Sequence, residues 1–287
     1  MEKLKIIECP RDAMQGIKPF IPTEQKISYI NHLLKIGFDT IDFGSFVSPK
    51  AIPQMADTAT VLKNLDLSSS SSKLLAIIAN SRGAEDAAQY DEITYLGYPF
   101  SISETFQQRN TNASIEESLI RLEKINNLAV KHNKKLVVYI SMGFGNPYGD
   151  EWSPDIVIHW SKRLNDLFGI DVLALSDTIG IADSKTITSL FETLIPALPT
   201  VEFGAHLHAT PGNYEEKVKS AYLAGCRRFD GAIKGYGGCP MAKDDLTGNM
   251  PTEGMVEWFK TNNIETNLNH ELIAEAVSMS AQIFPQF

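Results

Sequence analysis

The chain has 287 residues, with 35 acidic and 26 basic side chains and a formal net charge of −9. This length fits one large domain or two ordinary ones, and it is ample for a hydrophobic core. The hydrophobic fraction of 43% and the charged fraction of 21% exclude a chain that is disordered as a whole. The negative net charge gives no general attraction to nucleic acid or to an anionic membrane, so neither partner is expected.

The N-terminal segment and the cysteines indicate where the protein works. No apolar run approaches the roughly 18 residues of a transmembrane helix, and residues 1–5 have neither a secretory signal nor an Arg-rich transit pattern. The three cysteines, Cys9, Cys226 and Cys239, are odd in number and far apart. A disulfide framework is therefore not expected, and a reducing, cytoplasmic location is predicted.

Short apolar runs alternate along the chain with longer segments of helical spacing. Ser114 with Glu117 three residues later predicts a capping box at one helix start, and Gly169 stands where another helix should end. The predicted strands are 4–7, 40–43, 74–78, 92–96, 136–140, 172–175, 201–206 and 227–230. The helical segments between them include 23–36, 115–132, 154–168, 184–198 and 213–224.

Eight strand–helix units in roughly 250 residues predict an α/β protein with a (β/α)8 TIM barrel. The alternative is a doubly wound open sheet. A glycine-rich dinucleotide fingerprint does not follow the first strand, where residues 9–12 read Cys-Pro-Arg-Asp, and polar residues follow nearly every strand; both favour the barrel. A further helix is predicted over 269–284, so we expect a single domain over 1–287, with the barrel at about 3–262 and a helical extension at about 263–287.

The carboxyl ends of the strands in such a barrel meet at one mouth, where active sites are built. The polar residues at these ends are therefore candidates for the chemistry. They are Arg11, Asp12, Asp42, Ser45, Asn80, Ser141, Asp177, Thr178, His206 and His208, with Asn249 in the loop after the eighth strand.

His206 and His208 are the most informative of these residues. Residues i and i+2 of a strand face the same way, so both imidazoles are expected to point into the mouth as metal ligands. The alternative is one buried, hydrogen-bonded histidine and one on the surface. Asp12 could complete the site or cap a turn, and Asn249 could donate an amide oxygen or merely belong to a Gly-Asn turn. Such ligands admit Mg²⁺ or Mn²⁺, and by ligand type also non-haem iron.

Two further side chains suggest polar catalysis. Arg11 beside a metal ligand would provide a fixed positive charge suited to an enolate or a carboxylate, unless it forms a structural bridge with Asp42 or Asp177. Cys239 lies in a glycine-rich loop, where an exposed thiol could act as acid, base or nucleophile. Cys9 and Cys226 are expected to be small buried residues. The loop lacks Gly-Lys-Ser/Thr, which favours a mobile lid over a phosphate loop.

Several segments together resemble the 3-hydroxy-3-methylglutaryl-CoA (HMG-CoA) lyase family. The resemblance spans roughly residues 6 to 260, and its most specific part is Gly-Gly-Cys-Pro-Met-Ala at 237–242, followed by Thr-Gly-Asn at 247–249. The other matching segments are 9–15, 45–50, 53–55, 112–118, 176–180 and 252–253.

The resemblance implies a metal-containing TIM barrel that cleaves HMG-CoA to acetyl-CoA and acetoacetate, in leucine breakdown or ketone-body formation. It also implies that Arg11 stabilises an enolate, that Cys239 donates a proton and that Asp177 is one of the polar groups around the site. Asp42 is a further candidate catalytic residue. The general base stays open among Asp42, Asp177 and His206. The implied ligands of the divalent metal are Asp12, His206, His208 and Asn249. The expected substrate contacts are Arg11, Gln15, Ser45, Asn80, Ser141 and Thr178.

Four departures from the family pattern surround the substrate and leave the implied ligands intact. Asp42 replaces a glutamate, and Ala-Thr-Pro-Gly at 209–212 replaces Asp-Thr-Tyr-Gly. Asn146 stands in place of a second Cys before Pro-Tyr, and residues 16–17 replace Asn-Glu. The departures leave open a related aldol lyase or Claisen-type synthase acting on another acyl-CoA or 2-oxo acid. A non-catalytic metal- or acyl-CoA-binding barrel is the alternative of another class, and a homodimer or larger homo-oligomer is also considered.

Overall fold

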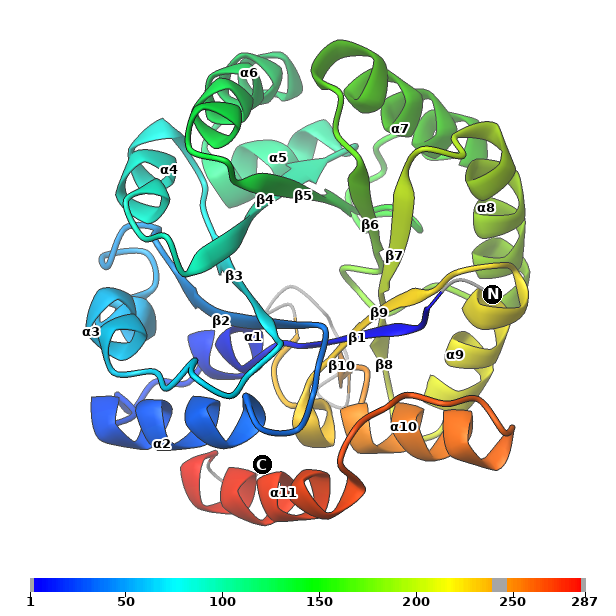
Figure 1. Cartoon of the computed structure of the whole chain (residues 1–287). Coiled ribbons are helices and arrows are strands. Elements are labelled where there is room, and N and C mark those ends of the chain that lie inside the picture. The colour runs from blue at the N-terminus through cyan, green and yellow to red at the C-terminus, as the bar shows by residue number, and fades with distance from the viewer. Residues whose placement is uncertain (1–2, 239–246, 285–287) are drawn as a thin grey trace.

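Eight parallel strands close into a barrel in the computed structural model, which describes residues 3–238 and 247–284 (Figure 1). The strands follow one another around the barrel in chain order, and the last one pairs with the first. The TIM-barrel prediction is confirmed. The barrel strands are β1 (Lys5–Glu8), β2 (Thr40–Ser45), β3 (Lys73–Ile77), β4 (Ile93–Ser101), β5 (Lys135–Ser141), β6 (Val172–Ser176), β7 (Glu202–His206) and β9 (Arg228–Gly231).

Helices surround the barrel, and several of them begin at a side chain that caps the first turn. The capping box of Ser114 and Glu117 is present, and Gly169 ends a helix with φ at +65°, a conformation that favours glycine. The helices up to the last barrel strand are α1 (Pro10–Gln15), α2 (Thr23–Leu33), α3 (Thr58–Lys63), α4 (Ser81–Ala88), α5 (Glu104–Thr111), α6 (Ile115–Lys131), α7 (Pro154–Phe168), α8 (Ser184–Ala197) and α9 (Tyr214–Leu223). Two 3₁₀ turns, η1 (Pro53–Met55) and η2 (Ile233–Gly235), lie in loops.

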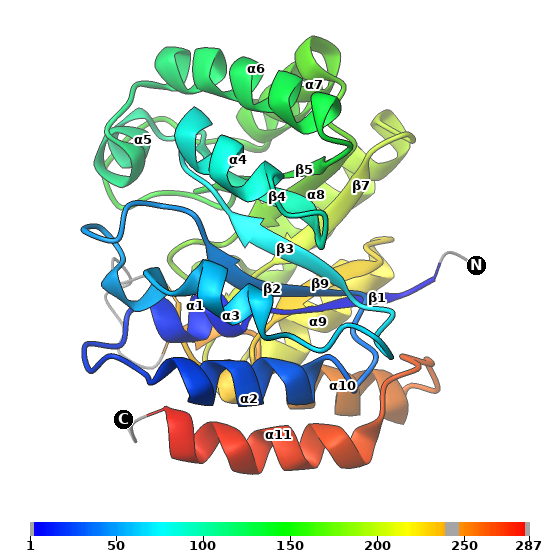
Figure 2. The same ribbon diagram turned by 60° about the vertical axis from the view of Figure 1, so that its left-hand side comes forward.

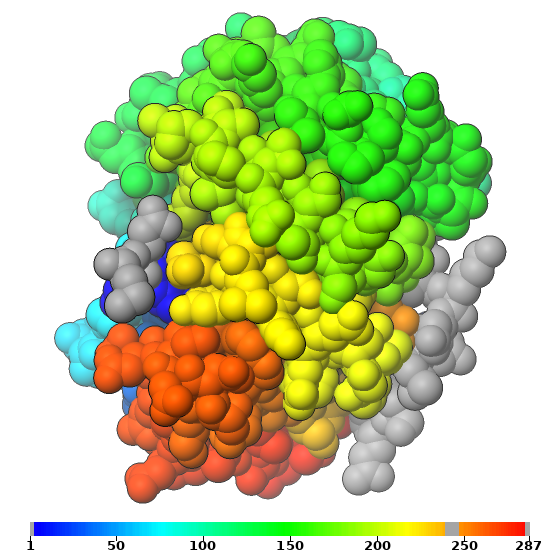
Figure 3. Space-filling view, turned by 90° about the vertical axis from the view of Figure 1, so that its right-hand side faces the viewer, coloured from blue at the N-terminus to red at the C-terminus, as the bar shows by residue number. Residues whose placement is uncertain are grey.

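Two helices follow the last strand of the barrel. The first, α10 (Thr252–Thr261), lies next to α9 on the outer surface (Figure 3). The second is α11 (His270–Ile283), which runs alongside α2 and contacts η2 (Figure 2). The additional helix predicted over 269–284 is therefore present. No helix in the described part of the chain is long and apolar enough to cross a membrane.

A two-stranded antiparallel sheet at the mouth corrects one expectation. His206 and His208 do not lie on one strand, because β7 ends at His206. His208 belongs to β8 (His208–Ala209), which pairs with β10 (Gly248–Asn249). The pairing places His208 opposite Asn249. The backbone at His208 therefore pairs with the segment after the eighth strand, and no longer with the neighbouring strands of the barrel.

The barrel interior is filled by side chains, as in other closed parallel barrels. One apolar cluster inside it consists of Leu75, Tyr95, Val137, Tyr139, Val172 and Ala174. A second and much larger core lies between the strands and the surrounding helices. With both faces of the sheet buried, polar groups that project inward need partners within the barrel.

Candidate metal centre and active site

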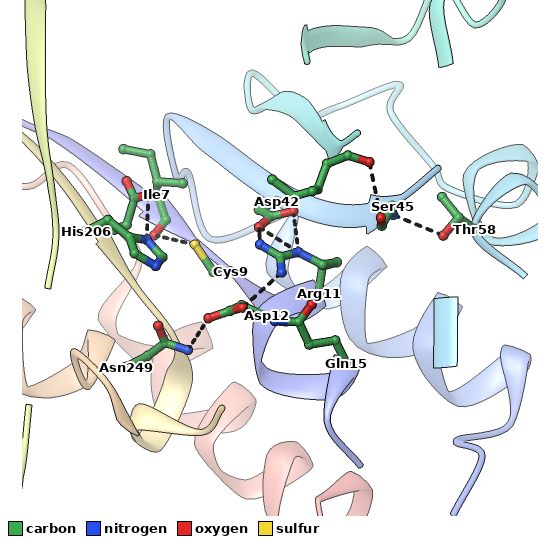
Figure 4. Close-up of polar contacts among 12 residues, drawn as sticks. Ile7, Cys9, Arg11, Asp12, Gln15, Asp42, Ser45, Thr58, His206 and Asn249 are labelled. Carbon is green, nitrogen blue, oxygen red and sulfur yellow. Dashed lines mark hydrogen bonds and ion pairs between the residues drawn. The ribbon is translucent and has the colours of Figure 1, made fainter. Parts of the chain in front are cut away.

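The short helix α1 begins directly after β1 and places Arg11 and Asp12 at the mouth. The Arg11 Nε atom donates to Asp42 Oδ1 and Oδ2 at 3.2 and 3.0 Å, and Nη2 donates to Asp42 Oδ2 at 2.5 Å. Its Nη1 atom donates to Asp12 Oδ1 at 2.9 Å (Figure 4). All three side chains are buried. The expected bridge between Arg11 and Asp42 therefore exists, and the same guanidinium also holds Asp12.

The two carboxyls have different proton affinities in this environment. Burial raises the pKa of Asp42 to about 6, against the opposing effect of Arg11. Burial also acts to raise the pKa of Asp12, but Arg11 and the two histidines outweigh it, and that pKa is lower than usual. Asp12 is thus a carboxylate at neutral pH, as a metal ligand must be.

Each histidine has one ring nitrogen fixed by an acceptor. His206 Nδ1 lies 3.1 Å from Asp230 Oδ2, and His208 Nδ1 lies 3.1 Å from the carbonyl oxygen of Thr178. A carbonyl can only accept, so His208 carries its proton on Nδ1 and leaves the Nε2 lone pair free. The centroids of the two rings are 5.6 Å apart.

The free nitrogen of His208 suits a metal ion. Its Nε2 atom is buried and has no hydrogen-bond partner among the described residues. Burial, followed by the effect of His206, lowers the pKa of His208 to about 4, which keeps the imidazole neutral. Potential ligand atoms of Asp12, His206 and His208 all lie within 4.8 Å of one another. Two imidazoles and a carboxylate at this spacing fit a divalent cation.

Asn249 lies beside this group. Its Nδ2 atom donates to Asp12 Oδ2 at 2.8 Å (Figure 4). The same atom donates to the carbonyl oxygen of Tyr236, also at 2.8 Å. These two bonds fix the plane of the amide and leave its oxygen as a possible fourth ligand. The aromatic ring of Tyr236 stacks on Phe284 just beyond α11, with centroids 4.5 Å apart. The C-terminal extension thus supports the loop that places Asn249.

A second group of possible ligands, Cys9, His206 and Asp230, is less suited to a metal. Burial raises the pKa of the Cys9 thiol well above its usual value, so the thiolate that a metal requires is disfavoured. Asp230 already lies within hydrogen-bond distance of His206. Cys9 and Cys226 are both buried, which confirms the expectation for them. The structure therefore favours the group with Asp12.

Asp177 has an anchoring position that the sequence did not indicate. Lys217 on α9 donates to Asp177 Oδ2 at 2.7 Å, and the Ala182 amide donates to the same carboxylate at 3.1 and 3.2 Å. Lys217 also donates to the carbonyl oxygen of His208 at 2.7 Å. The pair is buried and joins the loop after β6 to the segment of His208. Asp177 and Lys217 thus fix the backbone at His208, and this engagement disfavours Asp177 as a general base.

Three of the residues predicted to contact the substrate form hydrogen bonds within the protein. Gln15 joins the cluster, because its Nε2 atom donates to Asp12 Oδ1 at 2.5 Å. Ser45 at the end of β2 donates to the carbonyl oxygen of Ile77 at 3.2 Å. Thr178 Oγ1 accepts from the Met142 amide at 2.8 Å. The side chains of Ser45 and Thr178 therefore join neighbouring segments at the ends of the strands.

Asn80 and Ser141 complete the predicted set. Asn80 is the N-cap of α4, and its side chain accepts from the Gly83 amide at 3.0 Å. This capping role is sufficient to explain why an asparagine follows β3, so a contact with substrate is not needed to account for it. Ser141 is buried at the end of β5.

The described start of the glycine-rich loop, at Gly237, lies close to the backbone of Asp12 and Ala13. A Cβ atom on Gly237 would lie 2.6 Å from the carbonyl oxygen of Asp12 and 2.8 Å from Ala13 Cα, and its φ is +86°. Only glycine fits such a position. Cys239, the predicted proton donor, lies outside the residues that the structure describes.

Comparison with known proteins identifies the family. The model of the HMGL-like family matches residues 3–279. The chain belongs to this family. Hydroxymethylglutaryl-CoA lyase YngG of Bacillus subtilis is 36% identical over 267 residues, which cover 93% of this chain and 88% of the relative. The resemblance to HMG-CoA lyases seen in the sequence is therefore confirmed.

Solved structures of HMGL-like proteins superpose closely on this barrel. The B. subtilis HMG-CoA lyase has a TM-score of 0.92 at 35% identity, with 99% of this chain and 94% of that chain covered. An HMG-CoA lyase from Acinetobacter baumannii, in complex with coenzyme A and 3-methylmalate, has a TM-score of 0.89 at 28% identity, with 98% and 91% covered.

The residues that sequence reasoning missed are supporting ones. Asp230 and Lys217 hold the two histidine segments, and neither belongs to a recognisable motif. Asp230 ends the predicted strand 227–230, so the rule that polar strand ends face the mouth could have found it. Lys217 lies within a helix and gives no such signal.

Proposed function

We propose that this HMGL-like protein is a divalent-metal-dependent carbon–carbon lyase that cleaves HMG-CoA to acetyl-CoA and acetoacetate. The observation that carries the proposal is the group of Asp12, His206 and His208, whose ligand atoms lie within 4.8 Å next to the Arg11 guanidinium. A cation and a fixed positive charge side by side suit a reaction in which negative charge develops on two different oxygens.

The metal would be held by Asp12, His206, His208 and Asn249, with Mg²⁺ or Mn²⁺ as the proposed ions. When bound, the ion supplies positive charge that lowers the pKa of a substrate hydroxyl and orients it. Asp230 and the Thr178 carbonyl orient the two imidazoles from behind, which is the usual task of such partners. Gln15 and Arg11 hold Asp12 from the other side.

Arg11 is proposed to bind the oxygen of the thioester enolate that forms when the carbon–carbon bond breaks. Asp42 fixes the guanidinium through two of its nitrogen atoms, so the charge is in place before reaction. Preorganised charge of this kind needs no rearrangement in the transition state.

The proton of the substrate hydroxyl is proposed to pass to Asp42. The other two candidate bases are less suitable. Asp177 is bound to Lys217, and His206 has its Nδ1 atom within hydrogen-bond distance of Asp230, while its Nε2 atom would bind the metal. Burial raises the pKa of Asp42 to about 6, close to the value that suits a general base. Its Oδ1 atom makes only the long 3.2 Å contact to Arg11 within the described structure, and is the proposed acceptor. Cys239 is proposed to return a proton to the enolate carbon.

The test is product analysis with a panel of thioesters. The purified protein is supplied with Mn²⁺, a thiol reductant and HMG-CoA, malyl-CoA or citramalyl-CoA, and the cleavage products are quantified. Acetoacetate from HMG-CoA at the highest kcat/KM supports the proposal. Faster cleavage of malyl-CoA or citramalyl-CoA would assign the protein to a related aldol lyase, in line with Asp42 and residues 209–212. No cleavage of any thioester would favour a binding protein.

The cellular setting follows from this chemistry. A catalytic Cys239 must stay reduced, which agrees with the proposed cytoplasmic location. The products fit leucine breakdown or ketone-body formation. We also propose that the protein forms a homo-oligomer.

A further inference from the structure

A fully buried arginine, Arg228, lies inside the barrel. It is farther from the mouth than His206, because it stands at the start of its strand whereas His206 stands at the end of β7. Arg228 is the first residue of β9 and has no exposed surface. Its Nη1 atom donates to Glu202 Oε1 at 3.2 Å, and Glu202 pairs in turn with Lys5. The Nε and Nη2 atoms of Arg228 are buried without a partner in the part of the chain described. A buried guanidinium with two unused donors requires an explanation.

The barrel provides space for this side chain. Arg228 lies opposite Gly204 in the register of β7 and β9. A Cβ atom on Gly204 would lie only 3.1 Å from Arg228 Cδ and 3.6 Å from Ala174 Cβ. The guanidinium carbon is 5.6 Å from the centroid of the Tyr95 ring. Small neighbours and an aromatic face thus accommodate an arginine inside the barrel.

Two more buried polar atoms in the same interior have no hydrogen-bond partner among the residues that the structure describes. They are Tyr139 Oη and Asp230 Oδ1. Arg228 and Asp230 are two residues apart on one strand and therefore face the same side. Burial acts to lower the pKa of Arg228, but Asp230 and then Tyr139 raise it above its usual value, so these groups interact with the guanidinium. Donors and acceptors of matching kind thus share one part of the interior.

Asp230 connects this interior to the metal centre. Its other oxygen, Oδ2, lies 3.1 Å from His206 Nδ1. The Tyr139 ring contacts His206 edge-on, with centroids 5.3 Å apart and an angle of 77° between the rings. Whatever holds Asp230 and Tyr139 in place also holds the imidazole.

We propose that ordered water inside the barrel joins Arg228 to Asp230 and Tyr139, and that Arg228 is thereby a positioning residue for His206. The two nitrogen donors, the Asp230 oxygen and the Tyr139 hydroxyl are four polar atoms, enough for the roughly two to four partners that a buried water has. Arg228 then fixes Asp230, Asp230 fixes the ring of His206, and Nε2 faces the metal. This inference rests on the proposed metal-dependent function.

The test measures Mn²⁺ affinity at fixed pH by electron paramagnetic resonance of the free ion. Substitutions behind a metal ligand typically weaken binding by 10- to 100-fold, so Arg228→Met should weaken it about tenfold, at the lower end of that range. Arg228→Lys restores a buried donor and should recover most of the affinity. Arg227→Met is the matched control, because the Arg227 guanidinium bonds the carbonyls of Tyr222 and Cys226 outside the barrel.

Tyr139→Phe is a milder second variant that keeps the ring against His206 and removes only the hydroxyl. It should weaken Mn²⁺ binding severalfold, and it carries the test if circular dichroism shows that Arg228→Met does not fold. A crystal structure of the protein should contain water within hydrogen-bond distance of Arg228, Asp230 and Tyr139.

Three results would overturn the inference. The first is wild-type affinity in both Arg228→Met and Tyr139→Phe, and the second is a crystal structure in which Arg228 binds Asp230 directly without water. The third is equal loss in Arg228→Met and Arg228→Lys, which would indicate a packing role alone. A wild-type protein that binds no Mn²⁺ is a separate outcome, because it refutes the proposed metal site before any variant is compared.

Discussion

The Nδ1 atom of His206 lies 3.1 Å from Oδ2 of Asp230, a carboxylate on the neighbouring strand β9. The Nδ1 atom of His208 likewise lies 3.1 Å from an acceptor, the carbonyl oxygen of Thr178. Both imidazoles are thus held from behind through Nδ1, and the Nε2 atom of His208 has no hydrogen-bond partner among the described residues. The arrangement resembles that of metal sites in which a second layer of acceptors fixes the histidine ligands.

Asp230→Asn is expected to weaken Mn²⁺ binding by about 10- to 100-fold, because an amide cannot replace the carboxylate that orients His206. Isothermal titration calorimetry on folded protein checks this. Asp66→Asn is the matched control, since Asp66 is exposed and its side chain accepts hydrogen bonds only from Ser68 among the described residues. Unchanged affinity in Asp230→Asn would show that His206 does not depend on Asp230 for its orientation.

Arg11→Lys should lower kcat by about 10²- to 10³-fold, the typical loss when one preorganised electrostatic donor is removed. A lysine keeps a positive charge but cannot bind Asp42 and Asp12 with a rigid planar group. Steady-state kinetics on HMG-CoA measures the effect, with Arg109→Lys on α5 as the control. Near-normal turnover in Arg11→Lys would contradict a role for the guanidinium at the enolate.

Lys217→Met should cost about 3–5 kcal/mol of unfolding free energy, because it leaves the buried carboxylate of Asp177 without its cation. Urea unfolding measures this loss, and exposed Lys219→Met should show almost none. The double variant Lys217→Met with Asp177→Asn should lose less than the two single variants added together. Strict additivity would mean that the pair does not act as a unit.

Glu8 should make stability depend on pH. Its carboxyl lies within hydrogen-bond distance of the Ile233 amide and the Thr252 hydroxyl, and burial raises its pKa to about 8. The folded state therefore binds a proton that the unfolded state has released, so the unfolding free energy decreases as pH rises from about 4.5 to 8.

Glu8→Gln removes this ionisation and keeps the shape of the side chain. The variant should gain stability relative to the wild type between pH 6 and pH 8.5, as measured by urea unfolding at both values. A difference between the two proteins that does not change with pH would show that Glu8 titrates normally in the folded state.

Much of the fold could be predicted because each unit carries its own local signals. The runs at 136–140 and 172–175 match β5 and β6 within one residue at each end, and the capping box at Ser114 starts α6 where expected. Polar residues after the strands also converge, as Arg11, Asp12 and Asp42 show. Local pattern and barrel geometry together therefore specify most of the mouth.

The rest depends on pairing between distant segments, which a single sequence does not show. His208 leaves the barrel ladder because β10 pairs with its segment, some 40 residues along the chain. The bond between Lys217 and Asp177 likewise joins a helix to a loop 40 positions away. A charged residue within a helix or strand is usually solvated, so only the folded chain shows that Lys217 and Arg228 are buried.

The central claim is that Asp12, His206 and His208 hold a metal that carbon–carbon cleavage requires. It is tested most directly by acetoacetate release from HMG-CoA after chelation and after return of Mg²⁺ or Mn²⁺, in the wild type and in His208→Ala. Exposed His132→Ala is the control. We predict release that disappears with the metal, returns with it in the wild type and in His132→Ala, and stays absent in His208→Ala. Cleavage that survives chelation, or that His208→Ala performs at the wild-type rate, would contradict the account.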